Sequence, residues 1–235
     1  VSSAASDVYK RQFMKRSVLI ACLSCLLVLT GCKATLPSKD HTPGNSVYLV
    51  HEAKRKAPVV TVYEDLSCPD CKDFEKVFKQ RFRQMANNGD IELRYKILTF
   101  MGSEDTAVGM AAANAVGKGI EYHDAVFANW IKKPSRSQIR QDFPKASGIV
   151  GGDFDRFQHY YDDPAIRDGV HSSASDFLHE GEKLSNDFGT PFITVNGKEW
   201  KQWDGMGKKS KDDILKAIQV QAPVSYTHLR AHETE

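Results

Sequence analysis

Cys68 and Cys71 stand between a stretch that predicts a strand and a stretch that predicts a helix. Residues 59–63 are β-branched or aromatic, as is typical of a strand. Residues 69–86 predict a helix with one apolar face, because apolar side chains recur at steps of three and four: Phe74, Val77, Phe78, Phe82 and Met85. Residues 91–98 alternate between apolar and charged side chains, which predicts a strand with one buried face. Strand, helix and strand in this order nearly always form a right-handed unit with parallel strands.

The residues around the two cysteines predict an unequal pair of thiols. Proline is favoured at the first helical position, so Pro69 places Cys68 at the N-cap. There the sulfur faces unpaired N–H groups and the positive end of the helix dipole, which both favour the reactive thiolate. Cys71 follows one turn later, close enough to form a disulfide. We therefore expect Cys68 to attack or be attacked, and Cys71 to resolve the mixed disulfide.

Asp70, between the two cysteines, works against this activation. A carboxylate beside a thiolate disfavours a second negative charge. We therefore predict that Cys68 is a weaker acid, and the disulfide a milder oxidant, than with a basic residue at position 70.

A signal for export precedes this region. Residues 14–31 comprise a basic start, an apolar run and small residues, which is the plan of a secretory signal peptide. The apolar run of about 12 residues is shorter than the ~20 that a membrane-spanning helix needs. The end of this segment, Leu-Thr-Gly-Cys, resembles a bacterial lipobox, which implies cleavage before Cys32 and a lipid on Cys32. A plain signal peptide with an incidental cysteine is the alternative. The polar residues 32–46 predict a flexible tether.

The five cysteines fall into three groups. Cys22 and Cys25 are removed with the signal peptide, and Cys32 carries the lipid. Only Cys68 and Cys71 remain, in an exported protein that meets oxidants. Because such a pair closes a very small ring and staples little structure, a redox-active pair is the better interpretation.

The two ends of the chain share one DNA sequence. Residues 7–12 can be encoded by a sequence whose reverse complement, read two bases later, encodes residues 224–228. That sequence resembles the transposon end used to prepare sequencing libraries. We therefore expect residues 1–13 and 224–235 to be sequencing-adapter artefacts and exclude them from the predicted fold. A disordered arm and tail are the alternative.

Composition and charge exclude some classes of protein. Hydrophobic residues make up 41% and charged residues 26%, as in a globular chain and unlike a disordered one. The net charge of +2 becomes zero, with 27 basic and 27 acidic residues, once the ends and the signal peptide are removed. No basic stripe is visible, so we expect no nucleic-acid partner.

The rest of the chain predicts an α/β unit interrupted by helices. Residues 47–101 and 188–223 contain strands at 47–50, 192–195 and 198–200, an Asn-Gly turn and a final helix at 208–220. Residues 102–187 predict a helical insertion, with helices at 107–116, 121–132, 137–147, 153–161 and 165–187.

Two motifs carry a resemblance to a known family. Residues 59–71, VVTVYEDLSCPDC, with the helix that follows, resemble the DsbA-like branch of the thioredoxin superfamily, a family of thiol:disulfide oxidoreductases. Residues 189–197 resemble its second signature, a loop with a cis-proline opposite the cysteines. The resemblance covers residues 47–220 and implies an α/β thioredoxin fold with a helical insertion and no cofactor. It also implies that Thr190 and a cis Pro191 lie beside the reactive sulfur and bind an extended substrate. An ordinary trans proline opening a strand is the alternative.

The sequence departs from this family at two places. Many thioredoxin-fold proteins carry a buried acid six residues before the first cysteine, where this chain has Val62. Glu64 and Asp65 lie nearby and could relay protons to Cys71, but we expect them in a solvated loop. Asp70 replaces the His of the oxidase prototype, which leaves the direction of electron flow open.

Histidines and tryptophans give weaker signals. The insertion contains four histidines without metal-ligand spacing, which we expect at the surface and without a metal: His123, His159, His171 and His179. Trp200 and Trp203 could line a groove near the proline loop or pack in the core.

Together these features predict a lipid-anchored, extracytoplasmic thiol:disulfide oxidoreductase of the bacterial cell envelope, acting as an oxidase on exported proteins through Cys68 and Cys71. A membrane partner would re-oxidise it. Residues 33–46 are too few for a dimerisation domain, so we expect a monomer. A reductase or isomerase using the same pair is one alternative, and a copper chaperone that is not an enzyme is another.

Overall fold

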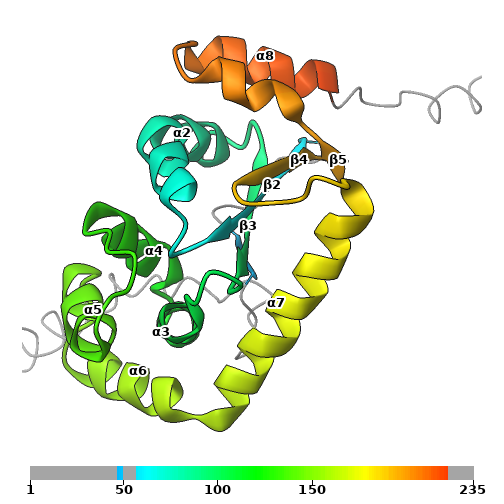
Figure 1. Ribbon diagram of the computed structural model, residues 1–235. Coiled ribbons are helices and arrows are strands. Elements are labelled where there is room, and N and C mark those ends of the chain that lie inside the picture. The colour runs from blue at the N-terminus through cyan, green and yellow to red at the C-terminus, as the bar shows by residue number, and fades with distance from the viewer. Residues whose placement is uncertain (1–46, 50–56, 222–235) are drawn as a thin grey trace, which may run out of the picture. The chain divides into compact units, whose positions relative to one another are not determined.

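The computed structural model describes residues 47–49 and 57–221 (Figure 1). The two ends assigned to adapter sequence, the signal peptide, Cys32 and the tether lie outside the described residues, so those expectations stay predictions. Among the helices that are described, none combines the length and the apolar character needed to cross a membrane.

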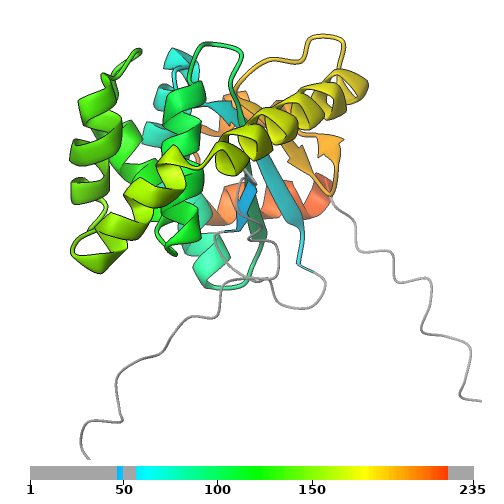
Figure 2. The ribbon, with the colours of Figure 1, turned by 90° about the horizontal axis from the view of Figure 1, so that it is seen from below.

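Five strands form one sheet in the order β1-β3-β2-β4-β5. The strands are β1 (Val47–Leu49), β2 (Val59–Asp65), β3 (Glu92–Leu98), β4 (Phe192–Val195) and β5 (Lys198–Glu199). β2 and β3 are parallel, as predicted, whereas β4 runs antiparallel to β2 and pairs Phe192 with Tyr63. β2 is buried along nearly its whole length because it lies at the centre of the sheet, between helices on both faces (Figure 2).

Helix α2 (Pro69–Asn87) follows β2 directly, and its predicted apolar face is buried. α2 packs with α8 (Lys211–Gln221) on one face of the sheet, whereas α7 (Pro164–Leu184) crosses the other face (Figures 1 and 2). Packing of α2 against the sheet thereby holds the two cysteines at the carboxyl end of the central strand.

Between β3 and β4 the chain is helical, as predicted. The helices are α3 (Glu104–Ala115), α4 (Gly119–Ala128), α5 (Phe143–Ala146), α6 (Gly152–Asp162) and α7. The helix predicted over 137–147 is divided, because Gln138–Asp142 form a π-helical turn before α5. α3 and α4 approach closely at Gly109, where a Cβ atom would come within 2.3 Å of the hydroxyl of Tyr122.

The segment after β5 differs from the prediction. The last helix begins at Lys211 rather than at residue 208, and Lys201–Met206 form a 3₁₀ helix that the sequence pattern did not predict. This 3₁₀ helix sets Trp203 edge-on to Phe74 of α2, with ring centroids 5.4 Å apart. Trp200 is fully buried, so one tryptophan belongs to the core and the other covers α2.

Candidate active site

The two cysteines have the unequal positions that the sequence predicts. Cys68 is the N-cap of α2, Pro69 is the first helical residue, and both cysteines are free thiols. Cys68 is 3% exposed, whereas Cys71, one turn into the helix, is completely buried. Only the sulfur of Cys68 is therefore within reach of another molecule.

The pKa values of the two thiols are shifted in opposite directions. A hydrogen bond from the Cys71 thiol lowers the pKa of Cys68 to about 6, although burial opposes this; contacts with Thr190 and the backbone N–H groups of Cys71 and Asp70 also lower it. Burial raises the pKa of Cys71 far above its ordinary value, and its hydrogen bond to Cys68 and the charge of Glu64 add to this effect. At neutral pH the pair therefore holds one thiolate, on Cys68.

The loop before β4 lies against the sulfur of Cys68. The Thr190–Pro191 peptide bond is cis. In its protonated form the thiol of Cys68 donates a hydrogen bond to the carbonyl oxygen of Thr190, with 3.3 Å between sulfur and oxygen. Residues 122 positions apart in the chain are thus brought together at the edge of the sheet.

Three polar side chains form a buried cluster behind the cysteines, which corrects two expectations. Glu64 and His123 are completely buried, and Glu75 is 2% exposed. The expectations that Glu64 lies in a solvated loop and that His123 lies at the surface were therefore wrong. β2 continues two residues beyond its predicted end and carries Glu64 into the core, where it contacts the imidazole of His123 on α4. His123 lies there because it shares a helix face with buried Phe127, against which its ring packs.

Asp65, also expected in a solvated loop, is buried and connects two loops. Its carboxylate accepts hydrogen bonds from the backbone N–H groups of Ser67 and Met101, at 2.8 and 2.9 Å. These hydrogen bonds fix the turn that leads into Cys68. Asp65 is therefore a buried structural residue and not the solvated loop residue that the sequence predicted.

Glu75 is a residue that the sequence interpretation missed. It lies on the buried face of α2, four residues after Cys71, and neither of its carboxylate oxygens has a hydrogen-bond partner among the described residues. Its spacing on the apolar face was a signal that could have revealed it. Val62, at the position where related folds carry an acid, is a buried apolar residue of β2.

The pKa values of Glu75 and His123 are both raised, so the cluster binds protons near neutral pH. Burial raises the pKa of Glu75 to about 7, partly offset by His123. Burial alone would lower the pKa of His123, but the charges of Glu64 and Glu75 raise it to about 9. Three charged groups border the cluster: Arg83 and Lys79 on α2 each form an ion pair with Asp124 on α4.

We expect this cluster to make the protein less stable as the pH rises from about 5 to about 9. Glu75 and His123 have folded pKa values above their ordinary values of 4.5 and 6.5, so the folded state holds protons that the unfolded chain releases at lower pH. Each stabilising contribution is complete below the unfolded pKa and is lost as the pH passes the folded pKa. Each unit of pKa shift corresponds to about 1.4 kcal/mol, so the free energy of unfolding should fall by several kcal/mol over this range in urea titrations.

The variant His123→Asn should flatten this dependence between pH 6.5 and 9. His159→Asn, which changes an exposed histidine, is the matched control and should retain the wild-type slope. Equal slopes in the wild type and His123→Asn would contradict the assignment.

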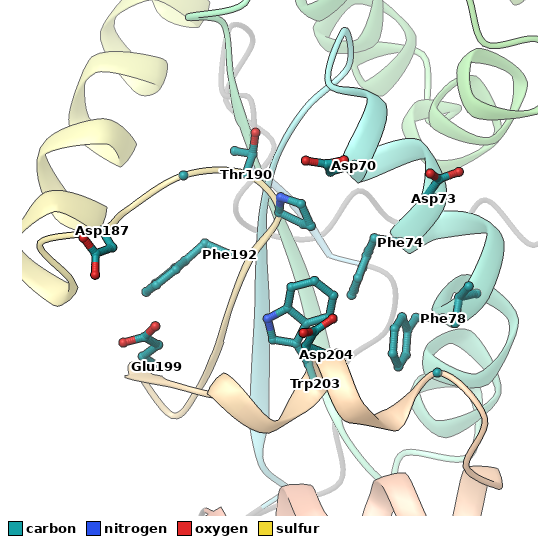
Figure 3. A pocket seen from close by; sticks show the side chains of 14 residues that line it. Asp70, Asp73, Phe74, Phe78, Asp187, Thr190, Phe192, Glu199, Trp203 and Asp204 are labelled. Atoms are coloured by element: carbon teal, nitrogen blue, oxygen red, sulfur yellow. The ribbon is translucent and has the colours of Figure 1, made fainter.

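A groove of about 640 Å³ opens beside the cysteines, between α2, the Thr190–Pro191 loop and the 3₁₀ helix (Figure 3). Its apolar lining consists mainly of aromatic rings: Phe74, Phe78, Phe192 and Trp203. Trp203 therefore lines a groove near the loop, which was one of its two predicted roles.

Comparisons with known proteins agree with this geometry. A family model described as Thioredoxin matches residues 50–219. No curated protein sequence matches the chain significantly. Among solved structures, the thiol-disulfide oxidoreductase MdbA from Actinomyces oris is 17% identical, with a TM-score of 0.60, and the match covers 82% of this chain and 96% of that one.

Two further structures show the same fold. DsbA from Mycobacterium tuberculosis is 17% identical with a TM-score of 0.56, and the match covers 77% of this chain and 94% of that one. BdbD from Bacillus subtilis is 20% identical with a TM-score of 0.55, and the match covers 79% of this chain and 95% of that one. The chain belongs to the thioredoxin family, and it shares its fold, with helices inserted between β3 and β4, with these solved MdbA, DsbA and BdbD structures.

Proposed function

We propose that this protein is an extracytoplasmic thiol:disulfide oxidoreductase that oxidises exported proteins through Cys68 and Cys71. One observation carries the proposal. The pKa values of Cys68 and Cys71 are shifted in opposite directions, at a helix N-terminus and beside the carbonyl oxygen of Thr190. A structural pair of cysteines needs neither the stabilised thiolate nor the neighbouring loop.

The electron balance fixes the steps of the oxidase reaction. A substrate thiolate attacks the Cys68 sulfur of the disulfide, the Cys68–Cys71 bond breaks, and its electron pair goes to Cys71. A second thiolate of the substrate then attacks the mixed disulfide and releases Cys68 as a thiolate, so the substrate leaves oxidised. In this direction Cys71 does not resolve the mixed disulfide, because its attack returns the substrate in its reduced form. Resolution by Cys71, as the sequence predicts it, belongs to the reverse, reductase reaction.

Cys71 must gain a proton when it leaves, since its pKa lies far above neutral pH. Glu75 is on the same helix face one turn later, and its pKa of about 7 suits an acid that donates at neutral pH and accepts in the reverse reaction. Glu64 and His123 are its buried neighbours, each with a polar atom within 4.8 Å of this carboxyl. We assign Glu75 the proton transfer to and from Cys71.

The stabilised thiolate favours the oxidase direction. A low pKa of Cys68 stabilises the dithiol form, and a stabilised reduced form makes the disulfide more oxidising. A reduction potential near −120 mV would support an oxidase, and one near −270 mV a reductase. Measuring the potential against glutathione buffers tests the direction.

We expect the variant Asp70→His to be the stronger oxidant. Exchange of a carboxylate for a partly cationic side chain beside Cys68 should lower the thiol pKa by about one unit, which corresponds to a potential about 30 mV higher. The Cys68 pKa can be titrated by alkylation, and Asp176→His on the distant helix α7 controls for the substitution itself. An unchanged or higher thiol pKa in Asp70→His would refute the prediction.

The proposed setting is the outer side of a bacterial membrane, with Cys32 lipidated and the protein a monomer that a membrane partner re-oxidises. The copper-chaperone alternative needs a third ligand beside the two sulfurs. Among the described residues, the one cluster with metal-ligand spacing is Glu64, Glu75 and His123, which includes neither cysteine. Stoichiometric Cu(I) binding without thiol exchange would favour the chaperone.

A further inference from the structure

The groove beside Cys68 carries charge of a single sign. Fourteen residues line it; none is basic and five are acidic: Asp70, Asp73, Asp187, Glu199 and Asp204. Figure 3 shows these carboxylates around the groove, with those of α2 opposite those of the proline loop and β5. The whole chain has a net charge of +2, so this acidity is local to the groove.

Most of these carboxylates are available to a ligand. Within residues 57–221, four of the five form no ion pair, and Glu199 alone is paired, at 3.6 Å from the exposed ammonium of Lys201. Arg81 reaches the far end of the groove from α2, but its guanidinium is bound by the backbone carbonyls of Gly207 and Lys209. Apart from Lys201 beside Glu199, no cation of the described residues therefore forms an ion pair with the carboxylates of the groove.

The floor of the groove is apolar. Trp203 stands edge-on to Phe74 and Phe78, with ring centroids 5.4 and 6.1 Å away. Aromatic faces bind the aliphatic stems of lysine and arginine as well as apolar side chains, while the charged heads extend toward carboxylates at the rim. An apolar floor with an acidic rim thus complements a polypeptide that is both apolar and basic.

We infer that the groove selects extended substrate segments in which basic and apolar residues flank the reacting cysteine. This inference rests on the proposed oxidase function and names its substrate class. The chemistry is the exchange already described: the segment's thiolate bonds to Cys68, and Cys71 takes the electron pair of the broken disulfide.

The test uses three reduced peptides that share one sequence with a single cysteine and differ only in flanking residues: two lysines, two glutamines or two glutamates. The rate at which the oxidised protein forms a mixed disulfide with each peptide is measured and expressed per peptide thiolate. Reaction of the same peptides with neutral bis(2-hydroxyethyl) disulfide corrects for their intrinsic reactivity. The lysine peptide should react at least about tenfold faster than the glutamate peptide at low salt, and the ratio should fall toward one at high salt.

Two variants that each lose three negative charges test whether the charge preference comes from the groove. Asp187→Asn/Glu199→Gln/Asp204→Asn removes three groove charges distant from the CxxC motif, and should bring the lysine-to-glutamate rate ratio close to one. Asp155→Asn/Asp176→Asn/Glu182→Gln removes three exposed charges outside the groove and should keep the wild-type ratio. A wild-type ratio of one, or the same loss in both variants, would overturn the inference.

The inference and the proposed function fail differently. If the oxidised wild type forms mixed disulfides with all three peptides at equal rates, thiol exchange at Cys68 stands and the groove does not select by charge. If it forms a mixed disulfide with none of them, including the neutral peptide, the proposed function fails, and the substrate inference fails with it.

Discussion

Replacing Cys68 with serine is expected to abolish disulfide exchange, with oxidation of a reduced, unfolded protein slowing by at least about a thousandfold. Serine cannot form the disulfide, and the other thiol cannot substitute for it, because Cys71 is completely buried and its pKa lies far above neutral pH. The measurement is the return of activity to a reduced, unfolded substrate enzyme mixed with each variant.

Cys71→Ser provides the matched comparison. It keeps the accessible thiol of Cys68, which attacks protein disulfides in the reverse reaction, and removes the thiol of Cys71 that would release the resulting mixed disulfides. It should therefore accumulate adducts with disulfide-containing proteins that appear on non-reducing gels. Cys68→Ser should accumulate none. If Cys68→Ser retained oxidation, or if Cys71→Ser trapped no adduct, the assignment of the two sulfurs would be wrong.

The second large effect is expected for Glu75→Gln. Glutamine keeps the shape of the side chain but cannot exchange a proton with Cys71, and positioned general acids or bases typically contribute 10²–10⁴-fold to a rate, so we expect about a hundredfold loss. The step to follow is release of glutathione from its mixed disulfide with Cys68, in which Cys71 must lose its proton. The rate should also lose its dependence on pH near 7, where Glu75 titrates.

The control for Glu75→Gln is Glu182→Gln, an exposed glutamate of α7. It should keep the rate and the pH profile of the wild type. A role for Glu75 in packing alone would change the midpoint of thermal unfolding but leave the pH profile in place. A wild-type pH profile in Glu75→Gln would therefore exclude the proton-transfer role.

The sequence predicted the parts of this site that depend on local pattern. Residues 59–63 and 69–86 have the periodicities of a strand and an amphipathic helix, and Pro69 defines the helix start, so the position of Cys68 followed from local rules. The Thr190–Pro191 loop was found through a second motif, because its place beside Cys68 is set by strand pairing that no local pattern encodes.

The parts that were missed depend on contacts between distant elements. Glu64, Glu75 and His123 come from β2, α2 and α4, and only Glu75 carries a local signal of burial, its spacing on the apolar face of α2. Their burial follows from the way the inserted helix α4 packs over the sheet and α2. The 3₁₀ helix that forms one wall of the groove was missed because the packing of Trp203 on α2, rather than periodicity, distinguishes it.

The pairing of β4 with β2 also determines when, during synthesis of the chain, the active site can form. The thiol of Cys68 and the carbonyl of Thr190 meet only after the chain has added 122 further residues and the sheet has closed around β2. In a chain that emerges amino terminus first, both cysteines appear long before the loop that would present a client to them. A partly emerged chain therefore carries both thiols without the Thr190–Pro191 loop beside Cys68, and the site is complete only once β4 has paired with β2.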